Sequence, residues 1–319
     1  MKSLMIQGTS SDAGKTVLVA GLCRSFANRG LRVAPFKSQN MALNSYVTPH
    51  GEVVARATAL QARAARQELC VHMNPLLLKP KGDELAQLMV HGKPCMDVTA
   101  SQYFLSDELQ ALKLRAIDES IAALRERYDV VIAEGAGSSA EPNLRRLDVV
   151  NMGVAHRLGA RVWIAVDIDR GGAFASMLGT LEVLRATSPA DLDLVDGFVL
   201  NKFRGDRRVL EPALDFMKER SNVPILGVLP YLPDLNLDEE DRLRERRCDN
   251  PEVDIAVIYL PHISNATDFR FFEAEHNVQV RYVRSAAALG RPDAIIIPGT
   301  KNTTWTSTTS AASGSSAPS

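Results

Sequence analysis

The stretch MIQGTSSDAGKTVLVAGLC, which begins at Met5, constrains the fold more than any other feature of the chain. A short apolar run, predicted to be a strand over Ser3–Gln7, leads into a loop of small residues, and an apolar-periodic helix is predicted over Gly14–Asn28. A loop of this kind directs successive backbone N–H groups toward one point at the helix N-terminus. The stretch therefore predicts an anion site at the end of a strand.

Short apolar runs alternate with helical patterns, which predicts an α/β fold with a mostly parallel sheet and helices on both faces. The other strands are expected over Arg32–Phe36, Leu85–Val90, Asp129–Ala133, Arg161–Val166, Gly197–Leu200 and Ile225–Leu229. The other helices are expected over Glu52–Gln67, Ser101–Glu126, Ala155–Leu158, Ala173–Ala186 and Asp206–Arg220. Ligands of such sheets bind at the carboxyl ends of the strands, so polar residues that follow strands are the candidate site residues.

The loop after the first strand is close to the phosphate-loop pattern G-x-x-x-x-G-K-[ST], although five residues rather than four separate Gly8 from Gly14. Lys15 could reach the β- and γ-phosphates of a nucleotide, and the Thr16 hydroxyl could bind Mg²⁺. The alternative is an ordinary turn with a chance GKT, but the flanking strand and amphipathic helix favour the phosphate loop. The expected nucleotide-binding residues are Gly8, Thr9, Ser10, Ser11, Ala13, Gly14, Lys15 and Thr16.

Two further charged residues follow predicted strands. Glu134 directly follows the apolar run YDVVIA, and a carboxylate at a strand tip with glycines after it can hold Mg²⁺. Lys37, in the loop VAPFKSQNMALNS, could counter the charge of a transferred phosphoryl group. The alternatives are a solvated acid at a turn and a surface loop, and the buried strand before Glu134 favours the functional interpretation.

The stretches VDIDRGG and VLNKFRGD also follow predicted strands. Asp167, Asp169 and Arg170 could contact a metal or substrate carboxylates, or could simply cap the next helix. The second stretch resembles the base-reading NKxD sequence of GTP-binding proteins, but Arg204 stands where that sequence has Asp. We therefore expect adenine contact through Asn201 and no GTP specificity.

Composition excludes some classes of partner. The formal net charge of −1 gives no field that attracts nucleic acid or an anionic membrane. No apolar run approaches the roughly 20 residues of a membrane span. The four cysteines are far apart and read as reduced thiols. We expect a cytoplasmic protein with no nucleic-acid or membrane partner.

The pattern changes near the end of the first α/β unit. Pro230–Pro251 is rich in charge and proline, as in a linker, and a second α/β pattern begins at Val253. The chain ends in a stretch of Ser, Thr, Ala and Gly that cannot bury enough surface to order itself. The predicted boundaries are 1–235 for a synthetase-like domain, 236–252 for a linker, 253–302 for a partial second domain, and 303–319 for a disordered tail.

Together these motifs resemble the cobyric acid synthases, glutamine-dependent amidotransferases of cobalamin biosynthesis. GTSSDAGKT, PFKSQNMALNS, MNPLLLKP, QLMVHGK, AEGAGS, VDIDRGG and PGTKNT occur in that family in this order, and the resemblance runs from about Met1 to Asn302. QNMALNS is the most specific piece. The loop and EGAG alone point more broadly, to the dethiobiotin-synthetase-like group that includes the cobyrinic acid a,c-diamide synthases.

The resemblance implies a reaction. The family uses ATP and Mg²⁺ to convert side-chain carboxylates of adenosyl-cobyrinic acid a,c-diamide to acyl phosphates, from which ammonia displaces phosphate on the way to adenosyl-cobyric acid. The expected catalytic residues are Lys15, Lys37, Glu134 and Asp12, and the expected metal ligands are Thr16, Glu134 and Asp12. The expected substrate contacts are Gln39, Asn40, Asn44, Asp169 and Arg170.

The chain departs from the family after PGTKNT. The family takes its ammonia from a class I glutaminase domain, with a nucleophilic Cys on a G-x-C-x-G turn. Cys23, Cys70, Cys95 and Cys248 all lack this setting. We expect a synthetase domain with a truncated glutaminase segment, whose strands Ile255–Leu260 and Ala294–Ile297 would lack partners.

Several alternatives stay open at this point. Ammonia could come from free ammonium, from glutamine, or through a separate glutaminase chain, and a homo-oligomer is equally compatible with the sequence. The chain could instead be a partition-type switch ATPase, which shares the loop and the parallel sheet but not QNMALNS. It could also be an inactive remnant, which the tail favours and the intact phosphate loop disfavours.

Overall fold

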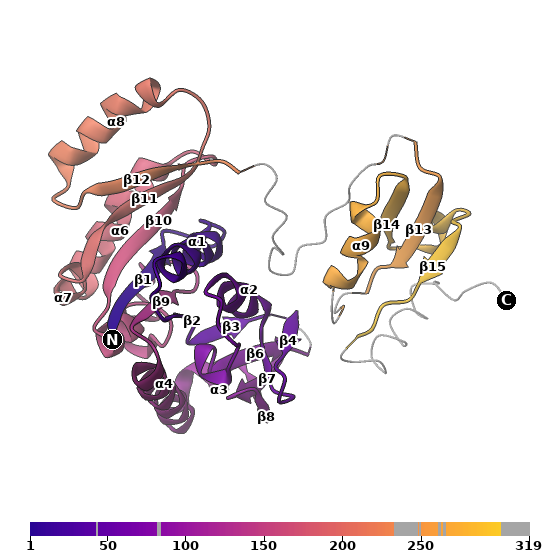
Figure 1. Cartoon of the computed structure of the whole chain (residues 1–319), viewed down its shortest axis with the longest axis horizontal. Coiled ribbons are helices and arrows are strands. Elements are labelled where there is room, and N and C mark those ends of the chain that lie inside the picture. The colour runs from indigo at the N-terminus through magenta and orange to yellow at the C-terminus, as the bar shows by residue number, and fades with distance from the viewer. Residues whose placement is uncertain are drawn as a thin grey trace.

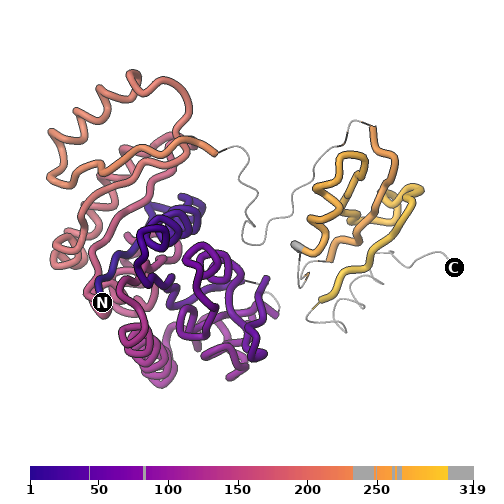
Figure 2. Tube along the Cα trace, in the orientation of Figure 1, coloured from indigo at the N-terminus to yellow at the C-terminus, as the bar shows by residue number. Residues whose placement is uncertain are grey.

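The structure is a computed structural model, and it describes residues 1–42, 44–81, 84–232, 248, 250–260, 263 and 266–300 (Figures 1 and 2). The predicted tail, 303–319, lies outside the described residues, and so do most residues of the predicted linker, 236–252. Among the described helices none is both long enough and apolar enough to cross a bilayer.

The first unit is built on a six-stranded sheet whose strand order is β12-β11-β10-β1-β9-β2 and whose strand pairs are all parallel. Its strands are β1 (Lys2–Gly8), β2 (Val33–Phe36), β9 (Val130–Glu134), β10 (Arg161–Asp167), β11 (Val195–Phe203) and β12 (Ile225–Pro230). This confirms the predicted parallel sheet. The carboxyl ends of β1, β9 and β10 meet at one edge, because Ile6 pairs with Glu134 and Gly8 with Ala165.

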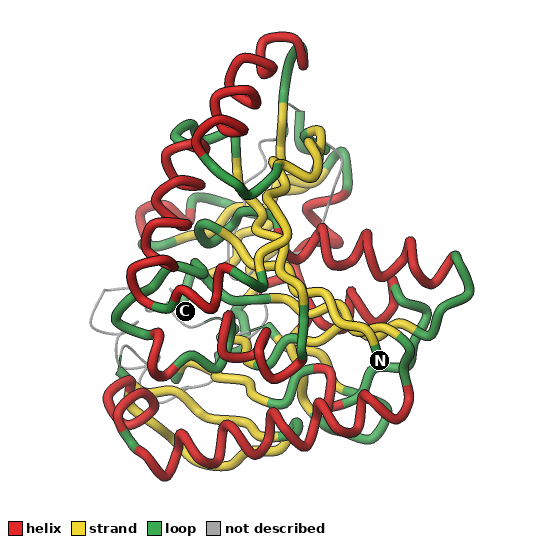
Figure 3. Tube along the Cα trace, turned by 90° about the vertical axis from the view of Figure 1, so that its left-hand side faces the viewer, coloured by secondary structure: helices red, strands yellow, loops and turns green. Residues whose placement is uncertain are grey.

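Helices cover both faces of this sheet, as Figure 3 shows. Successive strand residues alternate between two apolar clusters: Met5 packs in a large cluster with α4–α6 residues, and Ile6 packs in a second cluster with Val19 of α1. The helices of this unit are α1 (Lys15–Asn28), α2 (Arg56–Ala64), α3 (Ala100–Leu105), α4 (Asp107–Arg127), α5 (Met152–Leu158), α6 (Ala173–Thr187), α7 (Pro189–Leu192) and α8 (Arg207–Arg220), with 3-10 turns η1 (Val71–Met73) and η2 (Arg145–Leu147).

A second, mostly antiparallel sheet is inserted between β2 and β9, and the sequence did not predict it. Its order is β3-β6-β7-β8, and a separate hairpin pairs β4 with β5. The strands are β3 (Gln39–Met41), β4 (Ser45–Val47), β5 (Val53–Ala55), β6 (Leu76–Pro80), β7 (Leu85–Val90) and β8 (Lys93–Thr99). The strand predicted over Leu85–Val90 therefore exists with those bounds, but it does not belong to the parallel sheet.

The helix predicted over Ala155–Leu158 begins earlier, at Met152, and two longer predicted helices also have different limits. The helix predicted over Glu52–Gln67 begins only at Arg56, since the residues before it form β5. The helix predicted over Ser101–Glu126 is divided into α3 and α4 at Ser106, whose hydroxyl accepts a hydrogen bond from the Leu109 N–H and caps α4.

In the described part of the second unit, three parallel strands lie in the order β14-β13-β15. Its elements are β13 (Val253–Ile258), η3 (Ala266–Phe269), α9 (Arg270–Ala274), β14 (Val278–Val283), α10 (Ala286–Leu289) and β15 (Ala294–Ile296). The expectation that its strands lack partners is wrong. β13 lies between the other two strands, and Ile255, Val257, Val280 and Tyr282 form part of a small apolar core.

Candidate functional site

The phosphate loop joins β1 to α1 and turns sharply twice. Asp12 and Gly14 both have left-handed backbones, with φ of 59° and 89°. Gly14 is required there, because a Cβ at this position would lie 2.0 Å from the side-chain nitrogen of Asn201. The Lys15 ammonium folds back over the loop and donates to the carbonyl oxygens of Ser10 and Gly137, at 2.9 Å each. Lys15 therefore connects the phosphate loop to the loop after β9.

Glu134, the last residue of β9, lies beneath this loop with only 2% of its surface exposed. Its Oε1 accepts hydrogen bonds from the Thr16 hydroxyl at 2.9 Å and from the Lys37 ammonium at 3.0 Å. Its Oε2 accepts a hydrogen bond from the Gln61 amide. The structure thus brings together three residues that the sequence predicted, from α1, the loop after β2 and the tip of β9, with one that it did not.

The charge of this cluster is fixed by its contacts. Burial alone would raise the pKa of Glu134, but the Lys37 charge and the hydrogen bonds from Lys37, Gln61 and Thr16 outweigh it and lower that pKa. Glu134 is therefore an ionised carboxylate in a dry environment. The neighbouring Cys23 responds in the opposite sense, since burial and then the negative charge of Glu134 raise its pKa to about 12. Cys23 is a core residue rather than a nucleophile.

The donor set under the loop fits a magnesium ion bound together with a nucleotide. Two neighbouring oxygens in an octahedral Mg²⁺ shell with bonds of about 2.05 Å lie about 2.9 Å apart. The Thr16 hydroxyl and Glu134 Oε1 are 2.9 Å apart. Within the described residues no group of three His, Cys, Asp or Glu side chains could hold a metal. A metal here would need further oxygens from phosphate or water, as is usual for Mg²⁺.

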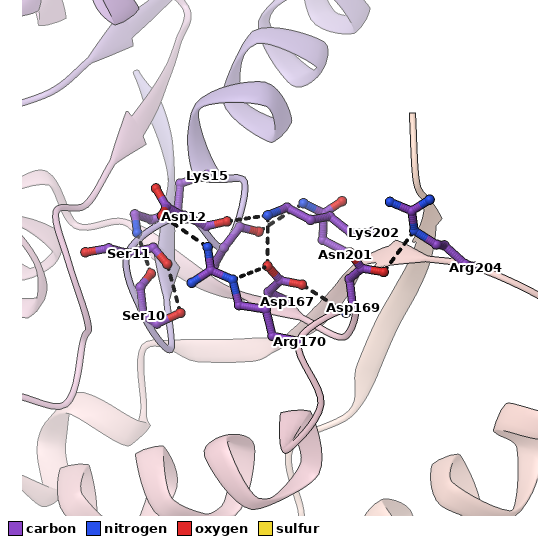
Figure 4. A network of polar contacts seen from close by, with 11 residues as sticks. Ser10, Ser11, Asp12, Lys15, Asp167, Asp169, Arg170, Asn201, Lys202 and Arg204 are labelled. Carbon is purple, nitrogen blue, oxygen red and sulfur yellow. Dashed lines mark hydrogen bonds and ion pairs between the residues drawn. The ribbon is translucent and has the colours of Figure 1, made fainter. Parts of the chain in front are cut away.

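A second polar network lies on the outer rim of the loop, over the tips of β10 and β11 (Figure 4). The Asp12 carboxylate pairs with the Arg170 guanidinium at 3.2 Å. The Lys202 ammonium donates to the Asp12 carbonyl oxygen at 2.7 Å and to the Asp167 carboxylate at 2.8 Å. The carboxylate of the predicted metal ligand Asp12 thus pairs with an arginine, and its role at the metal stays a prediction.

The other residues predicted at this rim support the loop or each other. The Asn201 amide donates to the Ala13 carbonyl oxygen at 2.9 Å, so this side chain braces the phosphate loop. Asp169 accepts a hydrogen bond from Arg204 at 2.9 Å, and the Arg204 guanidinium stacks on the Tyr231 ring. Adenine contact through Asn201 stays a prediction.

Two of the three substrate residues predicted after β2 are buried. Gln39 lies at the start of β3, and its side-chain oxygen accepts a hydrogen bond from the Tyr103 hydroxyl. Asn40 and Asn44 are buried, with 4% and 6% of their surfaces exposed. The Asn40 amide nitrogen has no hydrogen-bond partner among the described residues. Their contact with a substrate stays a prediction.

Two residues of the site were missed. Gln61 sits on α2, where a helical pattern gives no sign that a buried glutamine will reach β9. Asn151, just before α5, donates to the carbonyl oxygens of Ala136 and Ser138 at 2.8 Å each and so holds the loop after Glu134. No local signal marks either residue, because both contacts depend on how distant segments pack.

The chain matches two known families. Residues 4–243 match the family described as CobQ/CobB/MinD/ParA nucleotide binding domain, and residues 254–317 match the CobB/CobQ-like glutamine amidotransferase domain. The chain is 49% identical over 306 residues to a cobyric acid synthase of Pelotomaculum thermopropionicum, a match that covers 95% of this chain and 57% of the relative. It is 50% identical over 307 residues to that of Yersinia enterocolitica, with 94% and 58% covered. The chain thus spans less than two thirds of these relatives, and the predicted resemblance to cobyric acid synthases is confirmed.

Solved structures resemble the chain more distantly. MinD of Pyrococcus horikoshii, complexed with Mg-ADP, is 16% identical, with a TM-score of 0.37 over 73% of this chain and 82% of that one. The signal recognition particle receptor FtsY of Elizabethkingia anophelis, in complex with GDP, is 15% identical, with a TM-score of 0.41 over 71% of this chain and 56% of that one.

Proposed function

Because the chain belongs to the CobQ/CobB/MinD/ParA nucleotide-binding domain family, we propose that its first unit binds Mg-ATP and activates carboxylates for amidation. The proposed substrate is adenosyl-cobyrinic acid a,c-diamide, on the strength of the likeness to cobyric acid synthases. One observation carries the proposal: an ionised, buried Glu134 shared by Thr16 and Lys37 directly beneath a phosphate loop. The unit takes the proposed limits 1–235, and the amidotransferase-like segment the limits 253–302.

The proposed role of each residue follows from its position in the site. The loop N–H groups and Lys15 bind the phosphates, since Lys15 already lies over the loop and can exchange two carbonyl contacts for phosphate oxygens. Thr16 and Glu134 would hold Mg²⁺, because this ion needs oxygen ligands. Lys37, a buried cation 3.0 Å from Glu134, would offset negative charge on the transferred group.

ATP supplies the leaving group that a carboxylate lacks. A carboxylate oxygen of the corrinoid bonds to the γ-phosphorus as the bond to ADP breaks, and ammonia then displaces phosphate, forms the amide and loses its extra proton. Catalysis of such a transfer consists mostly of positioning and charge neutralisation. Arg170, half-exposed beside the phosphate loop, is the proposed contact for a substrate carboxylate, with Asp12 as its partner when no substrate is bound.

The source of ammonia is a separate question. None of the four cysteines of this sequence lies in a G-x-C-x-G turn, although residues 254–317 match an amidotransferase family. We therefore propose that this chain by itself uses free ammonium rather than glutamine. A separate glutaminase chain is the proposed route to glutamine. A homo-oligomer is the proposed alternative assembly, and the cytoplasm is the proposed location.

The test is ADP release from Mg-ATP by the purified chain with and without the corrinoid diamide, supplied with ammonium or with glutamine. The proposal predicts corrinoid-dependent ADP release with ammonium only, accompanied by amide formation seen by mass spectrometry. A Lys15→Met variant is the matched control and should release no ADP. ADP release at the same rate with and without the corrinoid would contradict the proposal and favour a switch-type ATPase.

A further inference from the structure

Gln61 connects the metal carboxylate to the phosphate loop from a third element. It lies in the middle of α2 with none of its surface exposed. Its amide nitrogen donates to Glu134 Oε2 and lies 3.4 Å from the Thr16 carbonyl oxygen. One amide group therefore contacts both residues that the proposed function assigns to Mg²⁺.

The donors around Glu134 are divided unequally between its two oxygens. Oε1 receives the Thr16 hydroxyl and the Lys37 ammonium, whereas Oε2 receives the Gln61 amide. Only Oε1 lies next to the Thr16 hydroxyl, the other expected metal ligand. The hydrogen bond from Gln61 therefore occupies the second oxygen and fixes the rotation of the carboxylate.

The other end of the same amide shows that this orientation has a cost. The Gln61 side-chain oxygen is buried and has no hydrogen-bond partner among the described residues. Leaving a buried acceptor unsatisfied costs about 1–3 kcal/mol. Turning the amide over would place that oxygen against the ionised Glu134, which is worse. A side chain that served only stability would not need to leave a buried oxygen without a hydrogen bond in order to donate to Glu134.

Mg²⁺ and Ca²⁺ differ in how they bind a carboxylate. Ca²⁺ takes six to eight oxygens at longer distances and often binds both oxygens of one carboxylate, whereas Mg²⁺ requires a compact octahedron. We propose that Gln61 is a positioning residue that limits Glu134 to one metal-facing oxygen and so makes the site select Mg²⁺ over Ca²⁺. This inference rests on the proposed nucleotide site.

The test is metal-dependent binding of a non-hydrolysable ATP analogue, measured by calorimetry in separate titrations with Mg²⁺ and Ca²⁺. Replacing Gln61 by Met keeps the volume and removes the amide. Changes to residues that hold a metal ligand typically alter affinity 10- to 100-fold, so we expect the Mg²⁺/Ca²⁺ affinity ratio to fall about tenfold. The matched control is Gln67→Met. Among the described residues, the Gln67 amide donates to the nearby Ala65 carbonyl oxygen, so this variant should leave the ratio unchanged.

A second variant keeps the inference testable if Gln61→Met does not fold. If circular dichroism shows that Gln61→Met does not fold, Gln61→Glu is measured in its place. This variant puts another carboxylate beside Oε2, so it should raise the affinity for Ca²⁺ relative to that for Mg²⁺. An unchanged ratio in a folded Gln61 variant would overturn the inference, and so would an equal loss of both metals, which indicates a structural role only. If the unaltered chain binds the analogue equally well without any divalent ion, the proposed metal site fails, and the inference fails with it.

Discussion

The buried pair of Lys37 and Glu134 makes a quantitative prediction about stability. Their side chains are 4% and 2% exposed, and 3.0 Å separates the ammonium nitrogen from Oε1. Glu134→Gln keeps the shape of the side chain but removes the carboxylate charge that the buried Lys37 ammonium contacts. Removing one partner of a buried pair costs about 3–5 kcal/mol. The unfolding equilibrium constant should therefore rise about 160- to 5,000-fold.

The assay is urea unfolding at pH 7 followed by tryptophan fluorescence. The chain has two tryptophans, and Trp163 lies on β10 of the parallel sheet. A Trp305→Phe background in every variant makes Trp163 the only reporter, so the signal follows the unit that contains the pair. The double variant Lys37→Met/Glu134→Gln removes both charges and should recover most of the loss. A loss below about 1 kcal/mol for Glu134→Gln alone would refute the assignment of a buried ion pair.

Three further predictions follow from the same contacts. Gly14→Ala should weaken binding of a Mg-ATP analogue at least about tenfold in calorimetry, because its Cβ would meet Asn201 at 2.0 Å and its φ is 89°. In the native chain at pH 8 a maleimide should label the exposed Cys95 and leave Cys23 unmodified, because a pKa of about 12 leaves only about one Cys23 thiol in ten thousand ionised. Labelling is measured by mass spectrometry, and early modification of Cys23 would contradict its burial. Folding lowers the pKa of Glu134. The contribution of its carboxylate to the free energy of unfolding is therefore complete above the unfolded-state pKa of about 4.3, and it is lost as pH falls through the folded-state pKa. Urea midpoints at decreasing pH should thus converge for the unaltered and Glu134→Gln chains, and parallel curves would contradict this.

Local pattern was sufficient for the part of the fold that carries the phosphate loop. The strand before Gly8 and the helix from Lys15 are both long and periodic, and the parallel strands of α/β units read as apolar runs. Because such strands end at one edge of the sheet, the proximity of Glu134, Lys37 and Thr16 could be expected from their places in the sequence alone.

The shortest strands of the inserted segment were missed for a physical reason. β3 of the inserted sheet and β4 and β5 of the separate hairpin have only three residues each, which is too short for a period of two to stand out from chance. The helical pattern over Glu52–Gln67 also continued through β5, so the helix was predicted to begin too early. Tertiary pairing with neighbouring strands overrides such weak local preferences.

The supporting contacts of the site were beyond prediction for a different reason. Asp12 and Arg170 are 158 positions apart, and Gln61 and Glu134 are 73 apart. No spacing rule links residues at such separations, because their contact depends on how α2 and the loop after β10 pack on the sheet. A charged side chain such as Asp12 can thus be recognised as part of a site while its partner stays unknown.

Isotope transfer tests the central claim most directly. The corrinoid diamide, labelled with ¹⁸O in its free side-chain carboxylates, would be incubated with the chain, Mg-ATP and ammonium, and the released phosphate would be examined by mass spectrometry. If carboxylates are activated as acyl phosphates at this site, each amide formed delivers one ¹⁸O to phosphate. Unlabelled phosphate would contradict the account, because ATP would then be cleaved by water rather than by the substrate carboxylate.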